Sequence, residues 1–512
     1  MNVSKAIKPN ILLITADQWR GDCLGAAGHP TIRTPNIDAL ASEGVTFLKH
    51  YAGTAPCSPA RATLYTGLYQ MNHRVCRNGT PLDARFDNLA QMARRAGYDP
   101  TLFGYTDTSP DPRALSERDQ QLTSYEGVLP GFTVRQLLPE HEKPWLSWLR
   151  LRGHEEAIDR SYHTATGKHG DGVSNAPPRY SKDETQTAFL TDEFLRWHSE
   201  QETSWFAHVS FLRPHPPYVV PEPYNEMFAP EQNIAAARAT SREAEANLHP
   251  FVRWLVEDQG SKKKKSFIPG AKGRIEEWDG AAFDQIRALY YGMIAEVDAQ
   301  IGRMLAAIRK AGQWNNTIII VTSDHGELMG DHWLLGKGGF FDGSYHIPLI
   351  IRDPKSPKAY GRKVKAFTSA ADIFPTLAQR LQVEPRTHPD GASLMPFIKG
   401  KTAPGWRDAA FFEYDFRGIA KEKAESHFDL PYQRCNLAVV RDDRFKYVHF
   451  PGLPPLLFDL EADPMELDNL ADDPAFHEIR LIYAEKLLDL RASHLDQTLA
   501  SMELTSDGIV KA

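Results

Sequence analysis

The chain of 512 residues contains little cysteine, no long hydrophobic run and no excess of positive charge. Its four cysteines, Cys23, Cys57, Cys76 and Cys435, are too few for the disulfide-stapled scaffold of a small secreted domain, so a reducing compartment is expected. No segment approaches the roughly 20 consecutive apolar residues that cross a bilayer, and the apolar run at 11–14 is too short for the core of a signal peptide. We therefore expect a soluble, cytoplasmic protein that makes no contact with a membrane.

Charge and composition narrow the class of protein further. Lysine and arginine together number 59 and aspartate and glutamate 66, which gives a net charge of −7. This mildly acidic balance lacks the broad positive field of a nucleic-acid-binding protein, so we expect no nucleic-acid partner. Hydrophobic residues make up 42% of the chain and charged residues 24%, which is ordinary for a globular protein and excludes a disordered chain or a collagen-like fibre.

The order of strand and helix patterns predicts an α/β fold. Residues 11–15 and 317–322 are short apolar runs without alternation, which is typical of strands covered on both faces in a parallel sheet. Thr34 and Pro35 begin a helix that Gly44 closes, and residues 283–311 place apolar side chains on one face of a long amphipathic helix. Helices that alternate with buried strands predict an α/β sandwich around a mostly parallel central sheet.

The texture of the chain changes after about residue 400. Two short strands joined by a polar turn, then a third strand and a helix, predict a small antiparallel sheet with a helix beside it. The predicted segments are strands at 436–440, 445–450 and 456–460 and a helix at about 476–490. We therefore expect a catalytic domain at 1–400 with insertions at about 110–185 and 225–275, a subdomain at 401–492, and a tail at 493–512 that could act as an oligomer arm.

Two acidic residues stand where the predicted strands end. Asp17 follows the first buried strand and Asp324 the second, and ligands of open α/β sheets bind outside the carboxyl ends of the strands. A single aspartate there would be read as the cap of the next turn. Two of them, with Gln18 and His325 adjacent, favour a site for a hard divalent cation held by oxygen ligands.

Cys57 begins the most specific motif of the chain, Cys57-Ser58-Pro59-Ala60-Arg61. Pro59 suits the first turn of a helix, so Cys57 is expected at a helix N-terminus, where the helix dipole lowers the pKa of a thiol. Taken alone, the motif is compatible with a reactive cysteine or with a small buried one. Arg61 lies at i+4 from Cys57 and therefore on the same face of the helix.

The motif C-x-P-x-R followed by a helix and Thr66-Gly67 resembles the signature of the type I sulfatases of the alkaline phosphatase superfamily. In that family a maturase oxidises the motif cysteine to formylglycine, whose hydrated aldehyde is the nucleophile. Other segments occur in the order of the family: Asn10-Ile11-Leu12-Leu13-Ile14 with Asp17, Thr34-Pro35-Asn36-Ile37-Asp38, Gly67-Leu68-Tyr69 and Thr322-Ser323-Asp324-His325-Gly326-Glu327. The resemblance covers nearly the whole chain and implies an alkaline-phosphatase-like sandwich.

The chain is more closely similar to the phosphonate monoester hydrolase branch, which uses the same formylglycine and also hydrolyses phosphodiesters and sulfate esters. The segments that carry this likeness are Asp17-Gln18-Trp19-Arg20, Gly104-Tyr105-Thr106, Pro110-Asp111-Pro112-Arg113, Arg213-Pro214-His215-Pro216-Pro217 and Leu334-Leu335-Gly336-Lys337. Many ordinary sulfatases have a second aspartate in place of Gln18 and an asparagine in place of His325. Both departures agree with the phosphonate hydrolase pattern.

The resemblance implies one divalent cation, Ca²⁺ or Mn²⁺, and assigns it ligands. Asp17, Asp324, His325 and an oxygen of modified Cys57 would hold the ion, and Gln18 would border the site and the substrate. The cation would polarise a non-bridging oxygen of the ester. Asp331 and His332 are also of metal-ligand types, but we interpret them as structural, since the relatives carry similar residues in that loop.

The remaining candidate residues would act on the substrate. Lys337 and His215 are candidates for protonating or neutralising the departing oxygen, although without the motif a surface lysine and a structural loop histidine would be preferred. Asn78 and Tyr105 would donate hydrogen bonds to the anionic ester. Asp107 departs from the phosphonate hydrolase pattern, which has a neutral threonine about there. A carboxylate would repel an anionic ester unless it is paired or protonated.

These assignments lead to an ordered set of functions. Hydrolysis of sulfate monoesters comes first because the maturation motif is shared by all sulfatases and Asp107 weakens the phosphonate match. Hydrolysis of phosphonate monoesters and phosphodiesters is the alternative, followed by a two-metal phosphatase or mutase and by a binding protein that has lost catalysis. The expected partners are a small anionic ester, the formylglycine-generating maturase and further copies of the chain in a dimer or tetramer.

Overall fold

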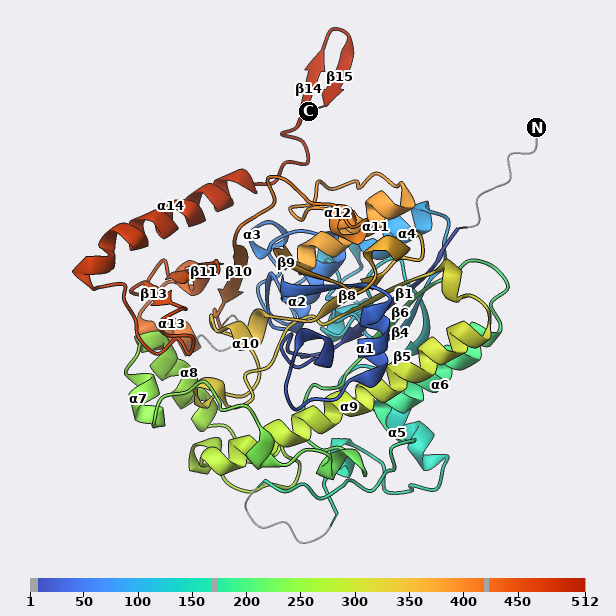
Figure 1. The fold of residues 1–512 in the computed structure, drawn as a ribbon, viewed down its shortest axis with the longest axis horizontal. Helices are drawn as coiled ribbons and strands as arrows, with labels where there is room; N and C mark the ends of the chain where they lie inside the picture. Colours follow the sequence, from blue (N-terminus) through green and yellow to red (C-terminus); the bar gives the residue numbers. More distant parts are fainter. Residues whose placement is uncertain (1–7, 167–172, 419–422, 512) are drawn as a thin grey trace.

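The computed structural model describes residues 8–166, 173–418 and 423–511, and its centre is an eight-stranded sheet (Figure 1). In spatial order the strands are β5 (Thr133–Leu137), β4 (Pro100–Gly104), β6 (Phe206–Phe211), β1 (Asn10–Ala16), β7 (Thr317–Thr322), β8 (Leu349–Arg352), β2 (Val45–Tyr51) and β9 (Arg362–Ser369). The strands from β5 to β7 run parallel, and β8 is antiparallel to both of its neighbours. The strands predicted at 11–15 and 317–322 are therefore neighbours in one sheet.

Helices cover both faces of this sheet. Leu12 and Ile14 of β1 contribute to one core and Ile11 and Leu13 to the other, so the alternation of the strand feeds two hydrophobic layers. The helices packed on the first face are α1 (Pro35–Ser42), α5 (Lys143–Arg150), α6 (Gln186–Ser199) and α9 (Gly280–Lys310). Those on the second face are α2 (Cys57–Thr66), α4 (Leu89–Arg95), α11 (Ile373–Leu381) and α12 (Met395–Ile398). The predicted α/β sandwich is confirmed, with α9 in the place of the long amphipathic helix.

A second, smaller sheet lies beside the sandwich. Its strands are β13 (Leu456–Asp459), β12 (Phe445–His449), β11 (Asn436–Arg441), β10 (Ala410–Asp415) and β3 (Thr54–Ala55), and α14 (His477–Ser493) packs on β11 and β12. Three of these strands and the helix match the prediction. The strand β3 was not predicted, and it pairs in parallel with β10 directly before Cys57. The C-terminal sheet is thereby hydrogen-bonded to the segment that enters the helix of the cysteine motif.

The two segments expected as insertions contribute regular structure. Residues 110–185 supply β5, an edge strand of the central sheet, and α5, while residues 167–172 lie outside the described residues. Residues 225–275 supply α7 (Arg242–Ala246) and α8 (Pro250–Gly260). The remaining short helices are α3 (Gln70–His73), α10 (Asp342–Tyr345) and α13 (Lys423–Phe428). The domain boundaries themselves stay a prediction.

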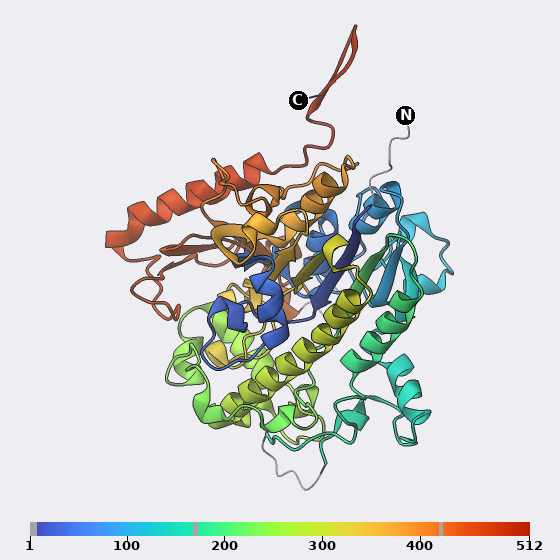
Figure 2. The ribbon, with the colours of Figure 1, turned by 45° about the vertical axis from the view of Figure 1, so that its right-hand side comes forward.

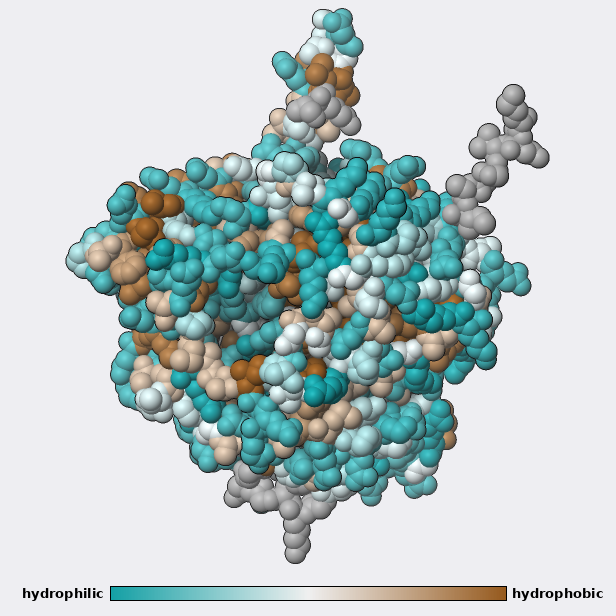
Figure 3. All heavy atoms as spheres, viewed as in Figure 1, coloured by the Kyte–Doolittle hydropathy of each residue, from teal (hydrophilic) through white to brown (hydrophobic). Residues whose placement is uncertain are grey.

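The tail at 493–512 contains a hairpin of β14 (Met502–Thr505) and β15 (Gly508–Lys511). Figures 1 and 2 show the hairpin standing away from the body of the molecule. Its apolar side chains face solvent, with Leu504 82% and Ile509 65% exposed, and they form the brown patch on the projection in Figure 3. Among the described residues, none of the helices has the length and apolar character needed to span a membrane.

Candidate active site

Asp17 and Asp324 meet at one edge of the central sheet, on either side of a buried arginine. The parallel pairing of β1 and β7 brings their carboxyl ends together, and each aspartate comes one or two residues after its strand. Arg61 of α2 lies between them, with Nη2 3.1 Å from Oδ2 of Asp17 and Nε 3.0 Å from Oδ2 of Asp324. All three side chains are fully buried. The convergence expected from the strand ends is thus present, and Arg61 neutralises half of its negative charge.

The guanidinium of Arg61 is fully engaged with the protein. Its Nη1 donates to Oγ of Ser210 at 2.9 Å and to the carbonyl of Tyr105 at 3.3 Å, and its plane lies 4.2 Å from the ring centroid of Tyr105. The hydroxyl of Tyr105 donates to Asp17. Arg61 and Tyr105 therefore hold the two carboxylates in place, and the structure engages Tyr105 with a carboxylate where the sequence predicted a bond to the ester.

Four ligand atoms from Asp17, Cys57, Asp324 and His325 lie within 4.8 Å of one another, and all four residues are buried. Oδ1 of Asp17 is buried and has no hydrogen-bond partner among the residues that the structure describes, which is a costly state for a carboxylate oxygen unless a cation is bound. The ring of His325 donates from Nδ1 to the carbonyl of Gly326 at 3.0 Å, so its Nε2 lone pair faces the cluster. The donor set fits a divalent cation.

The protonation states also suit a cation. Burial alone would raise the pKa of Asp17, but the positive charge nearby, that of His325 when its ring is protonated and that of Arg61, outweighs burial and lowers this pKa below its ordinary value. Burial lowers the pKa of His325 despite the carboxylate of Asp324, so the imidazole is neutral. A neutral imidazole and ionised carboxylates are the forms in which these residues bind metals.

Cys57 is the first residue of α2, as predicted, but its thiol is not activated. Its Sγ lies 3.3 Å from Nε2 of His325. Burial raises the pKa of Cys57 well above its ordinary value, and the neighbouring carboxylate of Asp17 raises it further. The expectation of a lowered thiol pKa is therefore wrong, because desolvation and two carboxylates outweigh the helix dipole. A thiol held in its protonated form is a poor nucleophile.

Gln18 binds Lys337 within the protein. Oε1 of Gln18 accepts a hydrogen bond from Nζ of Lys337 at 2.7 Å, and its Nε2 donates to Glu327. Burial alone would lower the pKa of Lys337, but negative charge nearby, that of Cys57 when its thiol ionises and those of the carboxylates, Asp17 first, raises it above its ordinary value. Lys337 therefore keeps its proton and places a positive charge beside the group of metal-ligand residues.

Glu327, for which the sequence predicted no role, holds Gln18 and thereby Lys337 in position. The carboxylate is fully buried, and its Oε1 accepts the backbone N–H groups of Met329 at 2.8 Å and Gly336 at 2.6 Å. It thereby ties the segment that ends in Lys337 to the strand end that carries Asp324. Its only signal in the sequence was its place in the motif Thr322 to Glu327, since the side-chain directions that decide its contacts are not visible there.

Ser58 links two further predicted residues to the start of α2. The backbone N–H of Ser58 donates to Oδ1 of Asn78 at 3.0 Å, which directs the amide nitrogen of Asn78 away from the helix. The hydroxyl of Ser58 donates to Oδ2 of Asp107 at 3.1 Å. Burial raises the pKa of Asp107 to about 8, and Oδ1 of this carboxyl has no partner. Asp107 is thus predominantly protonated at neutral pH and does not carry the charge that the sequence led us to expect.

His215 lies in a proline-rich loop held by buried charges. Its Nδ1 donates to the carbonyl of Pro216 at 2.8 Å, while Arg213 donates to the carbonyls of His215 and Pro217. Burial lowers the pKa of His215, and the charge of Lys337 lowers it further, so the ring is neutral with its Nε2 lone pair available. Of the two candidates for protonating the leaving oxygen, Lys337 is the one that carries a proton.

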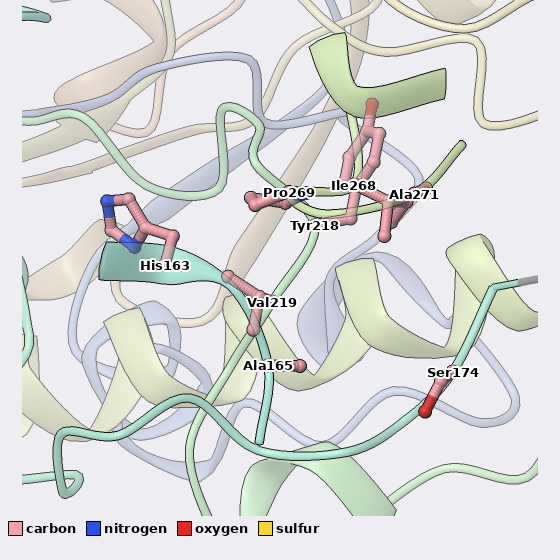
Figure 4. Close-up of a pocket in the computed structure, with 8 residues that line it drawn as sticks. All are labelled: His163, Ala165, Ser174, Tyr218, Val219, Ile268, Pro269 and Ala271. Atoms are coloured by element: carbon pink, nitrogen blue, oxygen red, sulfur yellow. The ribbon is translucent and has the colours of Figure 1, made fainter. Parts of the chain in front are cut away.

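A charged cluster beneath this loop fixes its position. His163 donates to Glu142 at 2.7 Å, and Arg213 lies 3.5 Å from the other ring nitrogen of His163. A small cavity next to the cluster, lined by His163 and Tyr218 among others, has about 10 Å³ of free space, enough for no more than one water molecule (Figure 4). We therefore interpret it as a packing void.

Asp331 and His332 have other partners. Asp331 forms ion pairs with Arg20 and with Arg287, the latter at 2.7 Å, and His332 lies 2.7 Å from Glu245 and stacks on Phe341. In the part of the chain that the structure describes, the group around Asp17 is the one cluster of metal-ligand type. These contacts agree with a structural role and give no support to a second metal site.

Comparison with known proteins identifies the family. The family model described as Sulfatase matches residues 9–383. The chain belongs to the sulfatase family. A second model, described as the C-terminal part of N-sulphoglucosamine sulphohydrolase, matches residues 330–493. Sulfatases generally use a divalent metal ion and a formylglycine.

Similar proteins cover the whole chain. The crystal structure of the phosphonate monoester hydrolase of Agrobacterium radiobacter is 64% identical, with a TM-score of 0.96 over 99% of this chain and 100% of that one. The multifunctional alkaline phosphatase superfamily protein PehA of Trinickia caryophylli is 39% identical over 98% of this chain and 99% of its own. An arylsulfatase of Clostridium perfringens is 29% identical over 94% of each chain. This sulfatase is accordingly a hydrolase that acts on sulfate or phosphonate esters.

The cluster generates a prediction about metal binding. Adding Mn²⁺ or Ca²⁺ to chelator-treated protein should raise Tm, since a ligand at one hundred times its Kd stabilises the folded state by about 2.7 kcal/mol. Asp324→Asn should lose most of this rise because it removes one charged ligand. Asp183→Asn, a change at an exposed aspartate, should keep it. An equal rise in Asp324→Asn and wild type, measured by differential scanning calorimetry, would place the ion elsewhere.

Proposed function

We propose that this sulfatase hydrolyses phosphonate monoesters and phosphodiesters as its primary substrates and sulfate monoesters as secondary ones. The observation that carries this order is the 64% identity, over the full length, to a phosphonate monoester hydrolase. The sequence alone favoured sulfate esters because all sulfatases share the maturation motif and because Asp107 looked like an added negative charge. Burial keeps that carboxyl protonated, which removes the objection. The preference for sulfate stays a prediction that the experiment below compares directly.

The nucleophile is proposed to derive from Cys57. Its buried, protonated thiol is a poor nucleophile, and it lies in the motif that a maturase modifies in the family that the chain resembles. Oxidation to formylglycine would replace the thiol by an aldehyde, whose hydrate offers an oxygen nucleophile. Asp17, Asp324 and His325 would hold a Ca²⁺ or Mn²⁺ ion, which supplies positive charge beside that oxygen and the ester.

Four side chains of the chain itself have roles in this proposal. Arg61 holds the carboxylates of Asp17 and Asp324 in place and compensates their charge. Lys337, fixed by Gln18, lies ready to protonate or neutralise the departing alcohol oxygen, which is the role of a general acid. Asn78 has its amide nitrogen free to donate to an anionic oxygen of the ester. The neutral His215 can accept a proton from a hydroxyl of the hydrate.

A rate comparison tests the substrate order. The values of kcat/KM for an aryl phenylphosphonate, an aryl phosphodiester and an aryl sulfate with the same aryl group should fall in that sequence, with sulfate at least tenfold below phosphonate. Cys57→Ala should be inactive on all three, which controls for a contaminating hydrolase. A sulfate ester turned over faster than both phosphorus esters would restore the order that the sequence favoured.

Asp107 generates a pH prediction. Its carboxyl has a pKa raised to about 8, so it is neutral below that pH and negatively charged above it. In the wild type, KM for an anionic ester should therefore rise several-fold above pH 8. Asp107→Asn should lack this rise, since an amide does not ionise, and asparagine tolerates the positive φ of 51° at this position. Asp119→Asn, at a half-buried aspartate that caps the short helix at 120–123, should behave like wild type; the same rise in Asp107→Asn would contradict the assignment.

We also propose that the C-terminal hairpin binds a second copy of the chain. An isolated two-stranded hairpin is marginally stable in water, so β14 and β15 need a surface to pack on. The apolar side chains of Leu504 and Ile509 are exposed on the hairpin, and those of Leu481 and Leu488 on α14. Twofold symmetry is the commonest symmetry of soluble oligomers, and two copies related by a twofold axis can exchange such arms.

Light scattering on two variants tests the arm. Removal of residues 494–512 should reduce a dimer or tetramer to a smaller species, and the double variant Leu504→Glu with Ile509→Glu should do the same with the chain length kept. Glu503→Lys, on the same hairpin, changes charge without removing apolar surface and should keep the assembly. A monomeric wild type, or an assembly unchanged by both variants, would contradict the proposal.

A further inference from the structure

A cavity of about 480 Å³ lies beside the cysteine motif, and its walls come from parts of the chain that are distant in sequence. Its lining includes Pro56 and Asn78, Trp254 of α8, and Tyr414 and Phe416. Its volume is in the range of sites for small organic molecules. Of the residues given a role in catalysis or substrate binding above, Asn78 is the one that lines this cavity among the described residues.

The cavity borders segments that carry residues of the catalytic centre. Pro56 directly precedes Cys57, and Tyr414 pairs with Ala55 across the two strands β10 and β3. The hydroxyl of Tyr414 lies against Gly338, where an added Cβ would come within 2.9 Å of it, and Gly338 follows Lys337. We therefore expect a substrate held at the metal-ligand residues to direct its alcohol group toward this cavity. The oxygen of that alcohol is the one that Lys337 would protonate.

The walls of the cavity combine aromatic and charged side chains. Trp254, Tyr414 and Phe416 present ring faces or edges, which pack well against a flat ring. Among the described residues, four cationic side chains and two carboxylates also line the cavity, an excess of two positive charges. The cations are Arg77, Arg417, Lys262 and Lys423, and the carboxylates are Asp258 and Asp415.

The distribution of ion pairs singles out Arg77. Arg417 is paired with Asp415 at 2.6 Å, and Lys262 and Lys423 share Asp258 at 3.1 and 3.2 Å. Arg77 donates to the carbonyl of Arg417 at 2.9 Å, and no carboxylate pairs with it among the residues that the structure describes. Its charge is therefore available to a ligand.

Acidic side chains also lie near the catalytic centre. Glu140 lies close enough to raise the pKa of both Asp107 and Lys337, and Glu126 accepts the N–H of Glu140 at 2.5 Å. A second negative charge on a substrate would be repelled by this acidic pair and attracted by Arg77.

We infer that this cavity is a leaving-group subsite for esters whose alcohol is an aromatic ring that carries a carboxylate. The ring packs against the aromatic group of Trp254, Tyr414 and Phe416, whose rings contact one another at centroid distances of 6.1 and 6.5 Å. The carboxylate pairs with Arg77 in the same lining. The reactive group of the ester (phosphonate, phosphodiester or sulfate) lies at the metal-ligand residues Asp17, Asp324 and His325. The subsite rests on the proposed ester hydrolysis and adds to it the chemical class of the alcohol.

A matched pair of substrates tests the subsite. The phenylphosphonates of 4-(carboxymethyl)phenol and of its carboxamide have leaving groups of similar basicity, because the methylene separates the ring from the group that differs. The ratio of their kcat/KM values, acid over amide, should be about tenfold in wild type and should fall as salt is added. Arg77→Gln should bring the ratio close to one, and Arg77→Lys should keep most of it.

The control and the contrary outcomes are distinct. Arg196→Gln removes an exposed positive charge from α6 and should leave the ratio as in wild type. A ratio near one in wild type, or a high ratio that survives Arg77→Gln, would overturn the subsite while both esters are still hydrolysed. Failure to hydrolyse either ester would instead contradict the proposed function.

Discussion

A guanidinium placed between two carboxylates, all without solvent contact, is the interaction on which the catalytic centre depends. Arg61 binds Asp17 and Asp324, and its remaining donors are used by Ser210 and Tyr105. Breaking such a buried pair typically costs about 3–5 kcal/mol, because the partner is left as an uncompensated charge. The same arrangement leaves Oδ1 of Asp17 without a hydrogen-bond partner among the described residues, and a bound cation would satisfy this oxygen. The way in which the fold brings Arg61, Asp17 and Asp324 together can be understood from the need to compensate these buried charges.

The central sheet supplies the carboxylates, and the smaller sheet supplies the approach to them. β1 and β7 bring Asp17 and Asp324 together, while β3 joins the segment before Cys57 to β10 and so to the C-terminal sheet. Cys57 therefore lies next to a strand of the smaller sheet, and it belongs to the candidate metal-ligand group at the edge of the central sheet. An acidic chain can bind an anionic ester because charge is arranged locally: Lys337 and Arg77 are positive, and Asp107 is kept neutral by burial.

Much of this could be predicted from the sequence. Strand ends marked by polar residues predicted where Asp17 and Asp324 would meet, and the family resemblance supplied the roles of Cys57 and Lys337. What could not be predicted depends on side-chain direction and burial. Gln18 turns to Lys337 and Glu327, Tyr105 turns to Asp17, and the pKa of Cys57 rises because the thiol is desolvated beside a carboxylate. The pairing of β3 with β10 joins residues more than 350 positions apart, which no local pattern encodes.

The central claim is that Cys57 is modified before the enzyme works. Mass spectrometry of the peptide that contains Cys57, after expression with a formylglycine-generating maturase, tests it directly. The account predicts that the CH₂SH side chain is replaced by an aldehyde or its hydrate, and that the modified fraction of several preparations tracks their kcat. An unmodified thiol in a preparation with full activity would contradict the account.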